Sequence, residues 1–159
     1  MVDGVDRPQL SGVGHVGLSV TDLDRSISFY CDELGALLTV PPFDGFRGFS
    51  GRMAVLLLGV TVLDLYEHAA NRGERFEPSR TGLDHLALGA ESYDEVDAWV
   101  DWFDSRGIPH SDVRDSDGFG ALFDFVDPDG IQIEISFLDQ DMLRQASIAL
   151  TARNDNKTQ

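Results

Sequence analysis

The sequence predicts an α+β protein made of two βαβββ modules, and two repeats lead to this prediction. Residues 14–19 (GHVGLS) are echoed by residues 84–89 (DHLALG), 70 positions later. Residues 62–66 (VLDLY) are echoed by residues 132–136 (QIEIS) at the same spacing of 70. Between these repeats, both halves show the same order of strand, helix and hairpin signals. A duplicated module explains this order better than chance repetition of one short strand.

The first half reads as β-α-β-β-β. Residues 13–20 alternate in polarity as a strand does, and Thr21 or Asp22 can cap a helix that runs to about Leu34, where Gly35 ends it. Residues 36–40 form a short strand that we expect the pair Pro41-Pro42 to stop, because proline cannot donate to a ladder. A loop over 43–51 and a hairpin of strands 53–58 and 60–66 around Gly59 complete the module.

The second half repeats this order. Residues 83–90 form a strand, and Ser92 caps a helix over 93–105 that ends at Gly107. A short strand over 110–113 precedes a hairpin of strands 121–126 and 131–137. The turn of this hairpin is the Asp-Pro-Asp-Gly sequence at 127–130, a strong turn signal.

These elements predict four segments along the chain. The first module covers residues 12–68 and the second covers residues 82–138, with a polar linker over 69–81. Residues 139–159 form a C-terminal segment, in which we expect a short helix over 139–150 and a frayed tail over 151–159.

Composition narrows the class of protein. The chain has 159 residues and a formal net charge of −16, and Lys157 is its only lysine, so nucleic acid and anionic membranes are poor partners. The acidity fits either a solubilising surface or a groove that attracts a cationic ligand. Cys31 is the only cysteine, and no apolar run approaches the roughly 20 residues that cross a bilayer. We therefore expect a cytoplasmic protein without disulfides.

One histidine and one carboxylate recur in both modules. His15 lies 49 residues before Asp64, and His85 lies 49 residues before Glu134. Because strand side chains alternate between faces, the two histidines lie opposite the aliphatic residues of their strands, and both acids do the same. Neutral imidazole and ionised carboxylate are common ligands of divalent metals. The four residues therefore indicate a metal or catalytic site on one concave surface.

Glu67 is the rival to Asp64 as the first acid. It has the longer side chain, but it falls on the Leu63 and Leu65 face and lies 52 residues after His15, which breaks the repeat. We prefer Asp64, although its shorter side chain reaches a metal less easily. His68 follows the strand and is expected at the surface.

Five short motifs are spread over both halves of the chain. They are HVGLSV at 15–20, DRSISFY at 24–30, LG at 34–35, LDHLA at 83–87 and FVDPDGIQIE at 125–134. Together these motifs resemble the vicinal oxygen chelate superfamily, which includes glyoxalase I, methylmalonyl-CoA epimerase, extradiol dioxygenases, fosfomycin resistance enzymes and bleomycin resistance proteins. The resemblance covers about residues 12–137.

This resemblance implies an open, curved, eight-stranded mixed sheet around a ligand cavity. It implies that a divalent ion (Zn, Ni, Mn or Fe) is bound by the first and last strands of each module, which gives His15, Asp64, His85 and Glu134 as ligands. It also implies a small-molecule ligand and a homodimer.

At two places the chain lacks residues that particular families of this superfamily usually have, and these differences narrow the activity that the resemblance implies. Glyoxalase I usually has an arginine four residues after its first ligand, and this chain has Ser19 there, which argues against a glutathione thioester. Extradiol dioxygenases need a tyrosine where Asp124 stands, and a histidine that is absent between His110 and Glu134, so a dioxygenase is not expected.

Two functions remain. The first is a glyoxalase-like, metal-dependent lyase or isomerase that acts on a small oxo substrate through a metal-stabilised enediolate, with Glu134 as ligand and proton-transferring base. The alternative is a bleomycin-resistance-type protein that sequesters an antibiotic or another aromatic or cationic ligand without catalysis. The acidic charge and the group Phe43, Phe46 and Phe49 favour this alternative.

Overall fold

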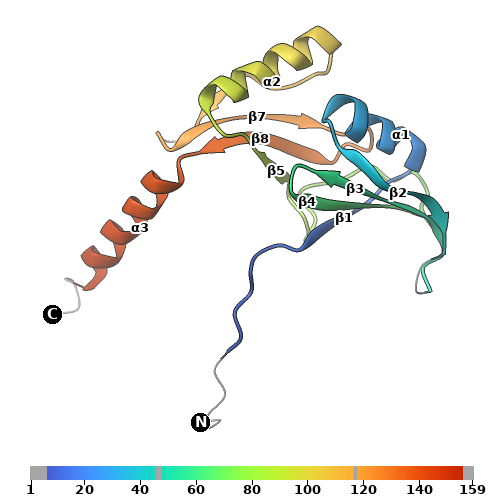
Figure 1. Cartoon of the computed structure of the whole chain (residues 1–159), viewed down its shortest axis with the longest axis horizontal. Coiled ribbons are helices and arrows are strands. Elements are labelled where there is room, and N and C mark those ends of the chain that lie inside the picture. Colours follow the sequence, from blue (N-terminus) through green and yellow to red (C-terminus); the bar gives the residue numbers. More distant parts are fainter. Residues whose placement is uncertain (1–6, 46–47, 117, 156–159) are drawn as a thin grey trace. The chain divides into compact units, whose positions relative to one another are not determined.

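The computed structural model describes residues 7–45, 48–116 and 118–155, and the chain divides into two compact units, Met1–Glu74 and Arg75–Gln159. Each unit has one four-stranded mixed sheet with a helix against it (Figure 1). Within the described residues, no helix has the length and apolar character needed to cross a bilayer.

The described residues of the first unit form six elements. In chain order they are β1 (His15–Ser19), α1 (Leu23–Ser28), the π-helical turn η1 (Phe29–Glu33), β2 (Leu37–Asp44), β3 (Gly51–Leu58) and β4 (Thr61–His68). The sheet order is β1-β4-β3-β2, in which β1 runs parallel to β4 and the other pairs are antiparallel.

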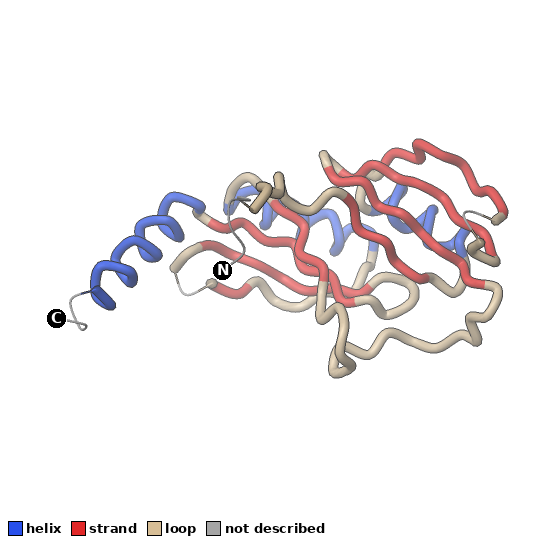
Figure 2. Tube along the Cα trace, turned by 90° about the horizontal axis from the view of Figure 1, so that it is seen from below, coloured by secondary structure: helices blue, strands red, loops and turns tan. Residues whose placement is uncertain are grey.

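The second unit repeats this topology and adds a C-terminal helix. Its elements are β5 (Leu86–Gly89), α2 (Tyr93–Arg106), β6 (Arg114–Asp115), β7 (Gly120–Val126), β8 (Gln132–Leu138) and α3 (Gln140–Asp155). The sheet order is β5-β8-β7-β6, again with the first strand parallel to the last. Figure 2 shows the strands in red and the helices in blue. The predicted α+β class with two βαβββ modules is therefore confirmed.

Local sequence explains where the helices begin and end. The Asp22 carboxylate accepts a hydrogen bond from the Arg25 amide at 3.0 Å, and the Ser92 hydroxyl accepts one from the Glu95 amide at 3.2 Å. Both contacts satisfy N–H groups that a helix N-terminus leaves unpaired. Gly107 ends α2 in the left-handed conformation with φ 67°, which glycine adopts without steric cost.

The two cores lie between each sheet and its helix. In the first unit, Leu18, Leu63 and Leu65 alternate with exposed or half-buried neighbours, as the period-2 pattern predicts. In the second unit, Phe103 of α2 packs edge-on against Phe123 and Phe125 of β7. Since the aliphatic and aromatic faces point to the helices, the histidine and carboxylate residues lie on the opposite faces.

The prediction that Pro41-Pro42 ends the second strand is wrong. β2 continues through both prolines to Asp44, and the pairing with β3 shifts register between Val40 and Phe43. Over this stretch the two prolines stand against a single residue of β3, which is a bulge. Proline is tolerated there because β2 is an edge strand and the bulge removes the need for ladder donors.

The short strand predicted over 110–113 is also misplaced. β6 comprises Arg114 and Asp115, while His110 forms only a single bridge to Phe125. The Ser111 hydroxyl accepts a hydrogen bond from the Asp124 amide at 2.9 Å. A side chain therefore takes a place in the ladder that a backbone carbonyl would hold in a regular strand.

The C-terminal helix is longer than expected. α3 reaches Asp155 and thus includes part of the segment predicted as a frayed tail. Its first turn is capped by the Asp139 carboxylate, which accepts from the amides of Asp141 and Met142 at 3.0 and 2.9 Å. No glycine or proline follows before Asp155 to stop the helix. The predicted tail residues 156–159 lie outside the described part of the chain.

Candidate metal centre

The first histidine–carboxylate pair lies on neighbouring parallel strands. The register of β1 and β4 places His15 beside Val62 and Gly17 beside Asp64. The Nε2 atom of His15 lies 3.8 Å from Oδ2 of Asp64. The His15 side chain is 63% exposed and the Asp64 side chain is 14% exposed, so the imidazole is open to solvent above a largely covered carboxylate.

The spacing of these two atoms can be compared with metal geometry. Ligand atoms that bind one ion at about 2.0–2.2 Å in a tetrahedral site lie roughly 3.4 Å apart. The observed separation of 3.8 Å is a few tenths of an ångström larger, which a small side-chain rotation would close. The donor set also suits a borderline divalent ion. This pair therefore fits as half of a metal site.

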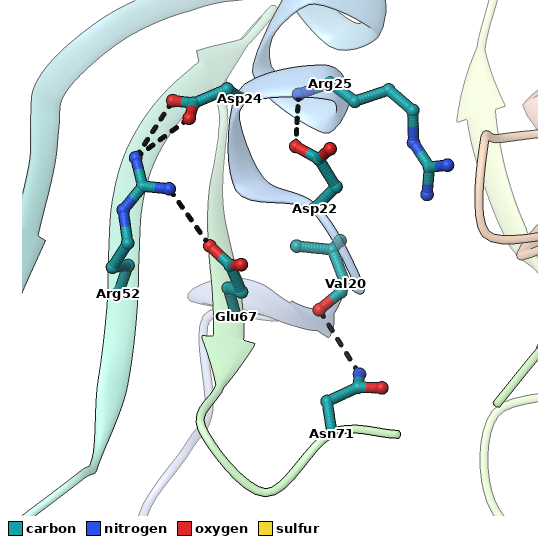
Figure 3. A network of polar contacts seen from close by, with 7 residues as sticks. All are labelled: Val20, Asp22, Asp24, Arg25, Arg52, Glu67 and Asn71. Carbon is teal, nitrogen blue, oxygen red and sulfur yellow. Dashed lines mark hydrogen bonds and ion pairs between the residues drawn. The ribbon is translucent and has the colours of Figure 1, made fainter. Parts of the chain in front are cut away.

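Glu67, the rival acid, lies on the other face of β4 and is engaged there. Its Oε2 atom is 3.2 Å from Nη1 of Arg52, whose Nη2 atom lies 3.0 Å from both carboxylate oxygens of Asp24 (Figure 3). This network ties α1 to β3 and β4 on the helix-covered side of the sheet. The structure thus brings Asp64 to His15 and holds Glu67 away from it.

Tyr66 shares the open face with Asp64, and sequence reasoning missed it. Its hydroxyl donates to Oδ2 of Asp64 at 3.4 Å. Burial raises the pKa of Tyr66, and the negative charge of Asp64 raises it further, so the phenol stays protonated and able to donate. The two-residue spacing from Asp64 was a usable signal, because positions i and i+2 of a strand share a face.

The second pair repeats the register of the first. Leu86 pairs with Ile133 and Ala87 pairs with Glu134, so Glu134 faces a small residue just as Asp64 faces Gly17. His85 directly precedes β5. The equal interval of 49 residues therefore corresponds to equal strand pairing in both modules.

His85 is oriented by the residue before it. Its Nδ1 atom lies 2.8 Å from Oδ1 of Asp84. This hydrogen bond is the largest cause of a raised His85 pKa, and the charges of Glu134 and Asp124 raise it further against the lowering effect of burial. A histidine whose Nδ1–H donates to a carboxylate presents Nε2 as an electron pair, which is the form that binds metals.

Asp124 and Arg114 extend this polar face across the sheet. Asp124 on β7 stands opposite Glu134, and its Oδ2 atom lies 2.5 Å from Nη2 of Arg114 on β6. The guanidinium offsets the charge of a carboxylate that is placed beside another carboxylate. Sequence reasoning missed Arg114, because its reach to Asp124 crosses strands diagonally and leaves no local pattern.

The other two histidines have local roles. His68 ends β4 and is exposed, as predicted, with its ring edge-on to Phe49 at 4.7 Å. His110 has its Nδ1 atom 2.8 Å from the Ser111 carbonyl oxygen and packs against Phe103 and Phe123. In the described residues, no three His, Cys, Asp or Glu side chains form a group that could hold a metal ion. The four-ligand set stays a prediction, since its pairs belong to different units.

The family model of the glyoxalase/bleomycin resistance protein/dioxygenase superfamily matches residues 12–135. The chain belongs to this superfamily. The match runs from just before β1 into β8, so it spans both modules with their histidine–carboxylate pairs and leaves α3 outside.

Individual members of the superfamily align over most of their length. The uncharacterized protein YaeR of Escherichia coli is 31% identical over 128 residues, which are 79% of this chain and 95% of YaeR. The metallothiol transferase FosB of Staphylococcus saprophyticus is 29% identical over 131 residues, 79% of this chain and 76% of FosB.

Solved structures of the superfamily share the fold. A glyoxylase/bleomycin resistance protein/dioxygenase domain from Frankia sp. EAN1pec superimposes with a TM-score of 0.73 at 30% identity, covering 82% of this chain and 99% of that domain. The fosfomycin resistance protein FosX from Listeria monocytogenes superimposes with a TM-score of 0.63 at 20% identity, covering 84% of this chain and 98% of FosX.

Proposed function

We propose that this chain is a metal-dependent enzyme of the glyoxalase type, a lyase or isomerase that acts on a small substrate with neighbouring oxygen atoms. One observation carries the proposal. Each module pairs a histidine with a carboxylate at the same strand register, and in the first module these groups approach to 3.8 Å. A purely structural duplication would not need to keep a histidine–carboxylate pair in both copies.

Descriptions of related proteins support a divalent ion. FosB is named a metallothiol transferase, and a glutamate-to-glutamine mutant of FosX from Listeria monocytogenes has been solved with Mn(II) and 1S,2S-dihydroxypropylphosphonic acid. A lactoylglutathione lyase from Agrobacterium tumefaciens shares the fold with a TM-score of 0.61 at 20% identity. We extend the use of a divalent ion to this chain, and we propose Zn, Ni, Mn or Fe as the candidates.

Each proposed ligand has a role that follows from its surroundings. His15, Asp64, His85 and Glu134 would hold the ion, which when bound supplies positive charge that polarises a substrate carbonyl. Glu134 would also accept and return the proton on the adjacent carbon. Small residues share the open faces of the first strands, namely Gly17 and Ser19 on β1 and Ala87 and Gly89 on β5, and all four are exposed.

The substrate class follows from charge and from Ser19. A chain with a net charge of −16 and no arginine at that position is poorly suited to a tripeptide thioester with several carboxylates. We therefore propose a small oxo compound or hydroxyketone as the substrate. We also propose that the enzyme is a homodimer in which each chain carries the same four metal ligands.

Hydroxyacetone in D₂O tests the reaction type, because metal-assisted proton removal next to its carbonyl exchanges hydrogen for deuterium. We expect exchange, followed by NMR, with the Mn(II)-loaded protein and its loss after treatment with EDTA. Asp64→Asn should lower the exchange rate on the order of 100-fold, since it removes a charged ligand. Glu67→Gln is the matched control and should stay near the wild-type rate. Equal exchange with and without Mn(II), or a loss in Glu67→Gln alone, would refute the assignment.

A binding protein is the second candidate, and one cluster favours it. Phe49 and Tyr66 pack edge-on at 5.3 Å beside the Asp64 carboxylate, an arrangement of aromatic rings and negative charge that suits an aromatic cation. Of the other two phenylalanines in the predicted group, Phe43 is half-buried on β2, and Phe46 lies outside the described residues. Calorimetry with bleomycin separates the candidates: stoichiometric binding without Mn(II), together with no deuterium exchange, would favour sequestration.

A further inference from the structure

Two side chains lie near Oδ2 of Asp64. The Tyr66 hydroxyl lies 3.4 Å from this oxygen, and Nε2 of His15 lies 3.8 Å from the same oxygen. The three side chains share the open face of the sheet, because Tyr66 follows Asp64 by two residues on β4 and His15 is on the adjacent strand β1. The phenol is therefore placed to select which way the carboxylate points.

The ring of Tyr66 is held where the hydroxyl can do this. A Cβ atom added at Gly17, which pairs with Asp64, would lie 3.3 Å from Cε2 of Tyr66, so the ring fills the space that the glycine leaves. On another side the ring meets Phe49 edge-on, with 5.3 Å between centroids. These contacts hold the Tyr66 ring over Gly17, on the side of the strand position that Asp64 occupies.

The second module lacks this arrangement. The residue two positions after Glu134 is Ser136, which is buried, and Glu134 pairs with Ala87 in place of a glycine. A tyrosine two positions along the strand is therefore found beside Asp64 and not beside Glu134. An aspartate carboxylate sits one methylene closer to the backbone than a glutamate carboxylate, so it depends more on its orientation to meet a neighbouring ligand.

We propose that Tyr66 is a positioning residue that donates its hydroxyl to Asp64 and holds Oδ2 in the direction of His15. This inference rests on the proposed function, because it takes Asp64 as a metal ligand. Gly17 contributes to this positioning, since a side chain there would displace the Tyr66 ring. The hydrogen bond from Tyr66 would compensate for the shorter side chain of Asp64, which depends more on its orientation than Glu134 does.

Mn(II) calorimetry on the full chain tests the proposal. Tyr66→Phe removes only the hydroxyl, and we expect it to weaken Mn(II) binding about 10- to 100-fold, the range found when a group that orients a metal ligand is lost. Gly17→Ala should weaken binding in the same direction by pushing the ring. Tyr93→Phe is the matched control, because Tyr93 is exposed on α2 and its ring contacts Phe137, and it should bind Mn(II) as the wild type does.

Co(II) absorption separates positioning from a general loss of structure. A positioned carboxylate sets the ligand field, so Tyr66→Phe saturated with Co(II) should show visible bands that differ from those of wild type in energy or intensity. A partly unfolded variant would instead show unchanged bands at reduced occupancy. Wild-type affinity and spectrum in both Tyr66→Phe and Gly17→Ala would overturn this inference and leave the proposed function standing. Failure of the wild type to bind Mn(II) would overturn both.

Discussion

Neighbouring carboxylates influence the ionisation of His85. The Asp84 carboxylate accepts from its Nδ1 atom at 2.8 Å, and the carboxylates of Glu134 and Asp124 add negative charge around the ring. All three favour the imidazolium, so the pKa of His85 in the folded, metal-free protein lies above the ordinary value of 6.5. A bound metal ion would compete with this proton.

The raised pKa of His85 predicts a pH dependence of stability. The stabilising contribution is fully present below pH 6.5, the ordinary histidine value, and is lost as the pH rises through the folded-state pKa. We expect the free energy of unfolding of the metal-free protein to fall over that window, and Asp84→Asn to shrink the fall. NMR titration of the His85 ring protons gives the pKa directly. A value at or below 6.5, unchanged by Asp84→Asn, would contradict the prediction.

At the residue scale, the sequence predicted faces better than contacts. Period-2 alternation placed Asp64 and Glu67 on opposite faces of their strand, and Glu67 is indeed held by Arg52 on the helix side. The same alternation does not show which neighbouring atoms a side chain can contact. The Tyr66 hydroxyl at Asp64 and the Arg114 guanidinium at Asp124 depend on rotamers and on diagonal neighbours across strands, which appear only once the register is known.

At the level of elements, the third strand of each module begins with a glycine that the fold requires. Gly51 has φ 143° and Gly120 has φ 159°. A Cβ atom at Gly51 would lie 2.1 Å from the Glu67 carbonyl oxygen, and one at Gly120 would lie 1.8 Å from the Phe137 carbonyl oxygen. Both glycines therefore let two backbones approach at the point where the hairpin pairing starts.

This close approach predicts unequal costs for glycine substitutions. Gly51→Ala should lower the free energy of unfolding by about 3 kcal/mol or more, because the new methyl group meets backbone that cannot move aside. Gly59→Ala is the control: its φ is also positive, at 57°, but no atom lies within 4 Å of an added Cβ. We expect it to cost about 1 kcal/mol from backbone strain alone. Equal costs in urea unfolding would contradict the contact seen at Gly51.

Helix ends that nearby residues determine agree with the sequence prediction, whereas β2 and β6 differ from it. The caps at Asp22 and Ser92 and the glycine stop at Gly107 use residues within one turn of the helix end, so sequence sufficed to find them. β2 continues through Pro41 and Pro42 only because it is a bulged edge strand, and β6 is displaced because Ser111 substitutes for the backbone. Both outcomes depend on a partner strand far along the chain.

At the scale of the whole molecule, duplication is the organising feature. The two units repeat the sheet order, the parallel pairing of first and last strands and the register of the acid against a small residue. They differ in the acid itself and in what surrounds it, with Tyr66 near Asp64 and the Asp124–Arg114 pair near Glu134. The superfamily could be predicted from the motifs, whereas the substrate could not, because superfamily members share these motifs across different activities.

Equilibrium dialysis against Mn(II), with the bound metal measured per chain, tests the central claim that both histidine–carboxylate pairs ligate a metal. We predict that the wild type binds one ion per chain, and that His15→Ala and His85→Ala each weaken binding by at least about 10-fold. His68→Ala, which changes an exposed histidine outside the pairs, should bind as the wild type does. A wild-type protein that binds no Mn(II), or His15→Ala and His85→Ala variants that bind it unchanged, would contradict the account.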